Sequence, residues 1–138
     1  MKTPKTWAAL LITGKDLDIT RISNLLNIDP NFSHSPGENP NNKDIGYWQL
    51  NSTLNDSEII ENHLWDLLKK LAPVRNQLKE IHKEFEIHFY CSVEFSNSGI
   101  DSLKLGPRLL SLIGNLGVSL EITRWAGKEL QSTDISLL

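Results

Sequence analysis

The sequence predicts an α+β fold, with a four-stranded, mainly antiparallel sheet and helices on one face. Runs of alternating or continuous apolar residues, typical of strands, alternate along the 138 residues with runs of helical periodicity. The first and last thirds repeat one plan of strand, loop, helix and strand. Two such units joined by a connector form a ferredoxin-like split βαβ sandwich, in which right-handed crossovers place both helices on the same face. The connector adds a helix or helix pair between the second and third strands.

The first strand is predicted over Thr6 to Gly14. Its apolar run from Trp7 to Ile12 is nearly continuous, which favours a central strand buried on much of both faces. Asp18 is suited to cap the helix that follows, which ends at Asn27 before Pro30. The apolar stripe of this helix consists of Ile19, Ile22, Leu25 and Leu26.

The second strand is predicted over Tyr47 to Thr53, after a long connection. Residues 29–46 hold three prolines and two glycines without periodicity, so we expect an exposed loop of a length that is often functional. The parity of the strand places Trp48 in the core and turns Tyr47 outward.

The next segment is predicted to form two helices. Asn55 or Asp56 caps the first, and Pro73 interrupts the chain before the second, because proline disfavours helical geometry at the preceding residue. Two antiparallel helical arms return the chain to the end of the sheet that it left. We therefore expect the strand Phe85 to Phe95 to run antiparallel to Tyr47 to Thr53, whereas one unbroken helix makes them parallel.

The third strand, Phe85 to Phe95, carries the clearest pattern in the chain, a strict alternation with a period of two. The inward residues are Phe85, Ile87, Phe89, Cys91, Val93 and Phe95. The outward residues are Glu86, His88, Tyr90, Ser92 and Glu94. Cys91 is predicted to be a small buried hydrophobe, because a reactive thiol needs exposure and an electropositive neighbour.

The last third predicts one helix, one strand and a tail. Pro107 occupies the permitted first position of the helix, and Gly117 ends it. Apolar and polar residues then alternate from Val118 to Thr123 as the fourth strand. We expect a single domain over residues 1–126 and a polar C-terminal tail over residues 127–138.

Composition limits the classes of function. The formal net charge is −3 and the pI about 5.8, with scattered basic residues, so binding to nucleic acid or to anionic lipid is not expected. No window holds the roughly 18 apolar residues needed to span a bilayer, so no membrane partner is expected. The single cysteine excludes an internal disulfide and, with no secretory signal, indicates the reducing cytoplasm.

Four stretches occur in an order that is similar to that of a known family. They are "LLITGKDLDITRISNLLNIDP", the loop at Gly37 running into "GYWQLNS", "IENHLWDLLKKLAPVRNQLKEI", and "LKLGPRLLSLIGNLGVSLEI". Over residues 6–123 the chain resembles the bacterial family named domain of unknown function 4279. The closing "EITRW" departs from that family, whose last strand tends to end with an aromatic residue after an acidic one. The resemblance implies one small α+β domain and brings no activity, ligand or catalytic residue.

No catalytic, metal or cofactor site is expected. The four histidines fall on a loop, a helix, a helix end and a strand, with no pair at ligand spacing. The sequence also has no Gly-rich phosphate loop and no serine nucleophile elbow.

The outer face of the sheet is the candidate interaction surface. The residues nominated for a partner or ligand are Tyr47, Glu86, His88, Tyr90, Glu94 and Trp125. Mixed aromatic and polar patches suit protein interfaces. We therefore interpret the chain as a non-enzymatic protein-interaction module, such as an immunity-type or accessory protein. It is expected to bind a protein partner or a second copy of itself through this face and the 29–46 loop. The alternative is an enzyme or small-ligand-binding domain, because adjacent Glu and His side chains can act as acid and base. A polar face that only meets water is the plain structural explanation.

Overall fold

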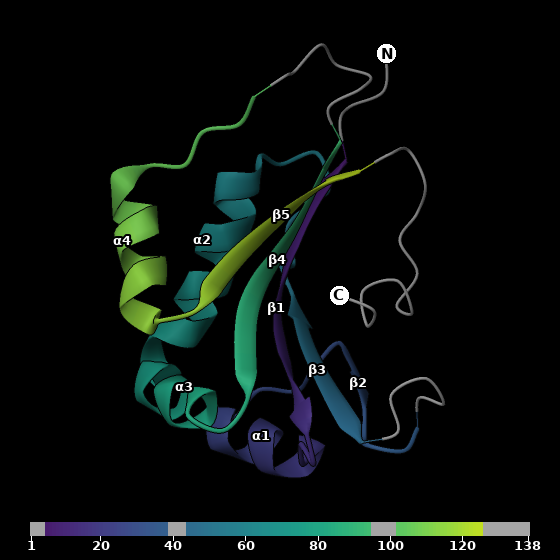
Figure 1. The fold of residues 1–138 in the computed structure, drawn as a ribbon. Coiled ribbons are helices and arrows are strands. Elements are labelled where there is room, and N and C mark those ends of the chain that lie inside the picture. The colour runs from purple at the N-terminus through teal and green to yellow at the C-terminus, as the bar shows by residue number, and fades with distance from the viewer. Residues whose placement is uncertain (1–4, 39–43, 95–101, 126–138) are drawn as a thin grey trace.

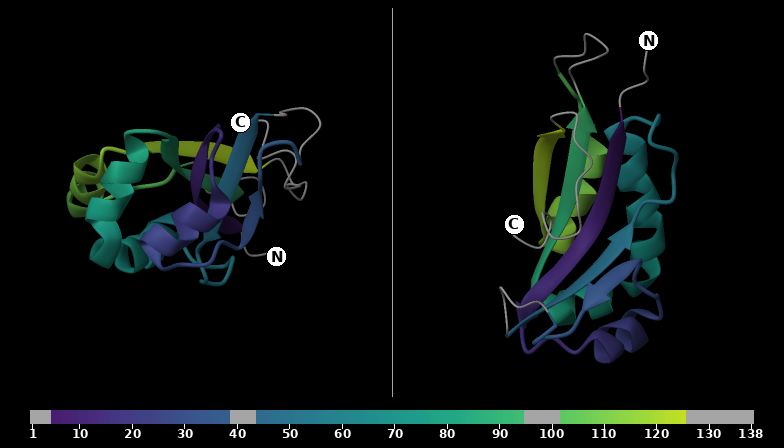
Figure 2. Two further views of the ribbon diagram at one scale, coloured as in Figure 1. Left: turned by 90° about the horizontal axis from the view of Figure 1, so that it is seen from below. Right: turned by 90° about the vertical axis from the view of Figure 1, so that its right-hand side faces the viewer.

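The computed structural model describes residues 5–38, 44–94 and 102–125, which form two layers (Figure 1). One layer is a five-stranded sheet, and four α-helices cover one of its faces (Figures 1 and 2). The elements are β1 (Thr6–Lys15), α1 (Ile19–Leu26), β2 (Phe32–His34), β3 (Ile45–Asn51), α2 (Ile60–Leu71), the 3₁₀ helix η1 (Ala72–Val74), α3 (Arg75–His82), β4 (Glu86–Glu94), α4 (Pro107–Leu116) and β5 (Ser119–Trp125). The α+β class is confirmed. The predicted tail over residues 127–138, and the inward position of Phe95, lie outside the described residues.

The order of the strands differs from the ferredoxin-like prediction. The sheet runs β2-β3-β1-β4-β5, and only the pair β4 and β5 is parallel. In a ferredoxin-like sheet the two strands joined through the first helix run parallel with another strand between them. Here β1 and β3 pair directly and run antiparallel. A split βαβ unit is present, but it joins β3 to β4 with β1 between them.

The short first helix explains why β1 and β3 are antiparallel. Lys15 at the end of β1 pairs with Ile45 at the start of β3, so residues 16–44 leave and re-enter the sheet at the same end. The eight residues of α1 rise only about 12 Å, whereas the ten residues of β1 extend about 33 Å. Helix α1 is therefore too short to carry the chain back to the other end of the sheet.

The helices between β3 and β4 form one crossover, and the prediction of two antiparallel arms is wrong. Pro73 falls in η1, where Ala72 and Arg75 keep right-handed helical geometry, so the chain bends there without reversing its direction. Together α2, η1 and α3 carry the chain to the end of the sheet where β3 began (Figure 1). Consequently β4 runs parallel to β3, because both are antiparallel to β1.

Strand β2 lies within the segment that was predicted to be a loop. Its three residues pair with β3, with Phe32 beside Gln49 and His34 beside Tyr47. The backbone N–H of Asn31 also donates to the backbone carbonyl of Gln49 at 2.8 Å. Three residues carry too little periodicity to predict a strand, and this one depends on its long-range pairing.

The main core lies between the sheet and the helices, and the predicted parity of β4 is confirmed there. Ile87, Phe89, Cys91 and Val93 are buried in this cluster with Trp48, whose indole Nε1 donates to Ser23 Oγ of α1 at 3.1 Å. Burial raises the pKa of the Cys91 thiol to about 12, so the thiol stays protonated.

The helix ends confirm the end signals predicted for α1 and α4 and contradict the cap predicted for α2. Asp18 caps α1 by accepting from the Arg21 amide at 3.1 Å, Pro107 begins α4, and Gly117 ends it at a φ of 74°. Helix α2, however, begins at Ile60 without a side-chain cap, because the residues after Asn55 first form a turn of their own. Leu25 was predicted to face the core, but it is 40% exposed because α1 presents only Ile22 and Leu26 as fully buried residues.

Candidate functional site: the open face of the sheet

The face of the sheet opposite the helices, here called the open face, is not covered by any helix of the described residues (Figure 2). Strand pairing aligns its side chains in rows across the sheet. The central row consists of Phe32, Gln49, Leu11, His88 and Ser119. The flanking rows are His34, Tyr47, Thr13 and Glu86 on one side, and Asn51, Ala9, Tyr90 and Glu121 on the other. The open face therefore combines rings, hydrogen-bonding groups and carboxylates.

A second apolar cluster occupies the centre of the open face. Tyr47 and Tyr90 pack there with Ala9 and Leu11, and Trp7 and Phe32 lie against the cluster. Both tyrosines point to the predicted side of the sheet, but they are only 2% and 1% exposed. Their rings are thus part of a core, and the expectation of exposed aromatic contacts at these two residues is wrong.

A chain of hydrogen bonds fixes the polar groups of β3. Tyr47 Oη donates to Gln49 Oε1 and Gln49 Nε2 donates to Asn51 Oδ1, both at 2.6 Å. The backbone N–H of Asn51 donates to the side-chain oxygen Oδ1 of Asn31 at 2.7 Å, which ties the residue before β2 to β3. Burial, and secondarily the nearby Tyr90, raise the pKa of Tyr47, so its hydroxyl remains a neutral donor. His34 stacks on the Tyr47 ring with centroids 5.3 Å apart.

His88 is the titratable group nearest the middle of the open face. Its Nε2 lies 3.8 Å from Glu121 Oε2, beyond hydrogen-bond length, and has no hydrogen-bond partner. Burial lowers the pKa of His88, while Glu121 and Glu86 act in the opposite direction. The imidazole is therefore neutral near pH 7. Ser92, two rows away on the same strand, also has a buried Oγ without a hydrogen-bond partner.

The six nominated residues do not converge on one site. Glu86 and Glu94 lie at opposite ends of β4, about 26 Å apart along the strand, and Glu94 is buried whereas Glu86 is exposed. The backbone of Trp125 pairs with Glu94, and its side chain lies outside what the structure describes. His88 has Glu86 on its own strand and Glu121, which was not nominated, on the next strand, whereas Tyr47 and Tyr90 pack together in the second apolar cluster.

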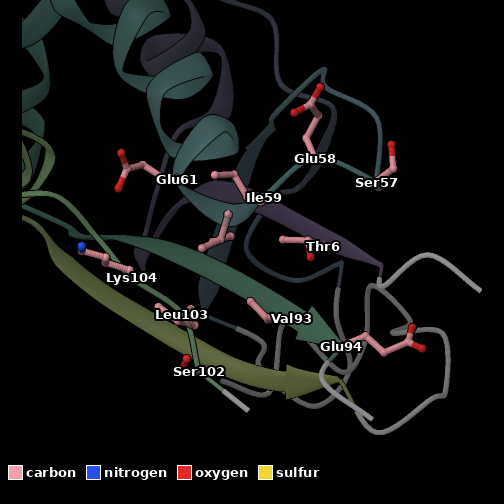
Figure 3. A pocket seen from close by; sticks show the side chains of 11 residues that line it. Thr6, Ser57, Glu58, Ile59, Glu61, Val93, Glu94, Ser102, Leu103 and Lys104 are labelled. Carbon is pink, nitrogen blue, oxygen red and sulfur yellow. The ribbon is translucent and has the colours of Figure 1, made fainter. Parts of the chain in front are cut away.

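Sequence reasoning missed a cavity of about 320 Å³ on the helix side (Figure 3). It lies between the start of α2, the start of β1, the end of β4 and residues 102–104. Its lining residues are Thr6, Ser57, Glu58, Ile59, Ile60, Glu61, Val93, Glu94, Ser102, Leu103 and Lys104. The Gly106 amide donates to Glu61 Oε2 at 2.7 Å, and Figure 3 shows Glu94 pointing away from the cavity. These residues come from four distant segments, so no local pattern signals them.

A second cavity, of about 430 Å³, lies among α2, α3 and α4. Leu68, Leu112 and Leu116 form its apolar part, and Arg75 and Lys79 are its charged residues. Neither of these two cavities is lined by His88. The concave pocket at His88 that an enzyme would need is therefore not among them.

A partly buried serine–histidine pair was also missed. His63 Nδ1 lies 2.8 Å from Ser52 Oγ, and the backbone N–H of Leu54 donates to Ser52 Oγ at 3.2 Å. Burial lowers the pKa of His63. Asp66 does not complete a triad, because its Oδ2 accepts from the amide and hydroxyl of Thr53. The pair thus holds the turn after β3 against α2. Within the described ranges no group of three or more His, Cys, Asp or Glu side chains is placed to hold a metal ion.

The family of this chain is shown by a match over most of its length, not by the residues of one site. A family model described as Domain of unknown function (DUF4279) matches residues 4–127. The chain belongs to this family. The description names no activity, ligand or partner. No curated protein and no solved structure matches the chain. Among the helices that the structure describes, none has the length and apolar character to cross a bilayer.

Proposed function

We propose that this member of the family is a non-enzymatic protein-interaction module that binds a partner on the open face of the sheet and on the adjoining segment 29–46. The proposal rests on the charged groups that border this face, Glu86 and Glu121, since the rings of Tyr47 and Tyr90 are buried. A cytoplasmic location belongs to the proposal and rests on the single cysteine, which leaves no internal disulfide.

The observation that carries the proposal is the acidic neighbourhood of His88. Glu121 is 44% exposed in its side chain, Glu86 is exposed, and both flank an imidazole whose Nε2 has no hydrogen-bond partner. Carboxylates bind guanidinium groups through short, charge-assisted hydrogen bonds. The partner is therefore expected to present arginine or lysine to β4 and β5. Phosphate backbones of nucleic acids are repelled by the same carboxylates.

The test compares two charge-matched double variants of the tagged chain in its native cells. Glu86→Gln with Glu121→Gln removes the carboxylates beside His88. Glu80→Gln with Glu84→Gln removes the same charge from α3 and from the turn that follows it. Proteins that copurify with the wild type and the control, but not with the first variant, support the proposal. Equal recovery with both variants contradicts it, as does the lack of any direct binding by a purified candidate partner.

The alternative function, a small-ligand-binding domain or enzyme, is favoured by one observation. His88 is held neutral beside Glu121 at 3.8 Å, which is the arrangement of a weak general base with an acidic neighbour. NMR of the imidazole during a screen of small polar molecules discriminates the two functions. Saturable shifts of the His88 signals by a small molecule support the alternative, and shifts only with a protein partner support the interaction module.

A further inference from the structure

We propose that strand β5 is a second interaction surface, through which two copies of this chain associate by antiparallel pairing of their β5 strands about a two-fold axis. This surface is the outer edge of the sheet, not the open face. The proposal is therefore independent of the function proposed for the open face.

The two edges of the sheet differ in how well they are protected. At one edge β2 has only three residues, and short edge strands offer little backbone for pairing. At the other edge β5 runs for seven residues without proline, and in the described part of the chain no strand lies beyond it. In an edge strand, alternate amide and carbonyl groups point away from the sheet, where another strand can pair with them.

Apolar side chains also lie at this edge. Ile122 pairs with the inward residue Cys91 and so lies on the helix side of β5, yet it is 38% exposed because β5 is the outermost described strand. Helix α4 lies over the same edge of the sheet (Figure 2). Arg108 lies over the Trp65 ring of α2 at 5.7 Å, and Leu112 lines the cavity against α2 and α3. Leu110, which helical spacing places on the opposite side of α4, is 47% exposed at the outer edge.

The sequence of β5 suits pairing with itself. A two-fold axis perpendicular to the sheet leaves each side chain on the same face of the sheet in both copies. Two residues can therefore pair across the axis only if their numbers are both odd or both even. A centre at Ile122 pairs all seven residues of the strand, sets Ile122 against its copy and places Glu121 opposite Thr123. A centre at Glu121 would oppose two carboxylates directly, which is destabilising. Ile122 is therefore the expected centre.

The helices can also meet across such an axis. Figure 2 shows α4 on the helix side of the sheet at the β4–β5 edge, so a two-fold axis just beyond β5 brings the two copies of α4 to the same side of the paired sheets. Gly114, one turn after Leu110, has no atom within 4 Å of where a Cβ would lie, so close approach is open there. A second copy thus covers Leu110 and Ile122 together.

Cysteine cross-linking tests the register. Ile122→Cys is expected to form a disulfide-linked dimer under mild oxidation, because directly opposed residues in an antiparallel pair have Cα atoms about 4.5–5.5 Å apart, within disulfide range. The native Cys91 does not interfere, since it is buried with a raised thiol pKa. Leu25→Cys is the matched control, with 40% exposure on α1. Equal cross-linking of Leu25→Cys, or stronger cross-linking of Arg124→Cys than of Ile122→Cys, overturns the proposal.

Sedimentation of unmodified protein gives the second readout. The wild type is expected to approach twice the chain mass of 15.6 kDa at near-millimolar concentration. Ile122→Glu should raise the dimer dissociation constant about a hundredfold or more, because two carboxylates then meet at the axis. Leu25→Glu should leave it unchanged, and circular dichroism verifies that both variants fold. A wild type that stays at 15.6 kDa throughout, or an Ile122→Glu protein that dimerises as the wild type does, overturns the proposal.

Discussion

Two identical substitutions, Gly46→Ala and Gly114→Ala, are expected to change stability in opposite directions. Neither glycine has a positive φ, so the backbone accepts alanine at both positions. A Cβ on Gly46 of β3 would lie 2.8 Å from Leu17 Cβ and 3.0 Å from the Leu17 carbonyl oxygen. A Cβ on Gly114 of α4 would meet nothing within 4 Å. The sign of each effect therefore depends on the tertiary surroundings.

The magnitudes follow from the packing at each position. At Gly46 the obstacle includes backbone, because Leu17 is fixed between Asp16 at a φ of 60° and the helix cap Asp18. Overpacking of this kind costs about 1–3 kcal/mol. At Gly114, replacing glycine in a helix by alanine contributes about 0.8–1 kcal/mol to stability. The two variants should thus differ by about 2–4 kcal/mol in free energy of unfolding.

Urea unfolding of dilute, monomeric protein, followed by circular dichroism, measures both values. The midpoint should fall for Gly46→Ala and rise for Gly114→Ala with an unchanged slope, since the exposed surface of the unfolded chain hardly changes. A Gly46→Ala protein as stable as the wild type would refute the close approach of Leu17 to β3. A loss of stability in Gly114→Ala would refute the open space beside α4.

Three further predictions test the burial and charge of particular side chains. His88→Ala should change the free energy of unfolding by less than about 1 kcal/mol, whereas Phe89→Ala, at the neighbouring inward position, should cost about 3–5 kcal/mol. Equal losses in urea unfolding would contradict the assignment of these two side chains to opposite faces of β4. Ser23→Ala should cost about 1 kcal/mol by leaving the Trp48 indole N–H without its acceptor, and should cost almost nothing in a Trp48→Phe background. Burial lowers the pKa of His63 below the 6.5 of the unfolded chain, so the unfolded state takes up more protons than the folded state. The free energy of unfolding should therefore fall as the pH drops below about 6.5. The same pH series on His63→Gln should show a shallower fall.

The candidate site was only partly predictable from the sequence. Alternation in β4 fixed which side chains share the open face, because a strand has a strict period of two. It did not predict that Tyr47 and Tyr90 are buried there, since their burial depends on Trp7, Phe32 and Leu11 from other strands. It also did not predict the Ser52–His63 pair or the cavity at the start of α2, whose members meet only after folding.

The sequence by itself determined the helices, four of the five strands and the inward row of β4, because these depend on periodicity, proline and glycine within one segment. Only the tertiary structure decided the strand order, the parallel direction of β3 and β4, and the existence of β2. A strand's partner depends on where the connecting segment returns the chain, and that return is set by helix length and by packing against the sheet. The same reason separates Gly46 from Gly114, which are alike in the sequence and differ only in which distant atoms lie beside them.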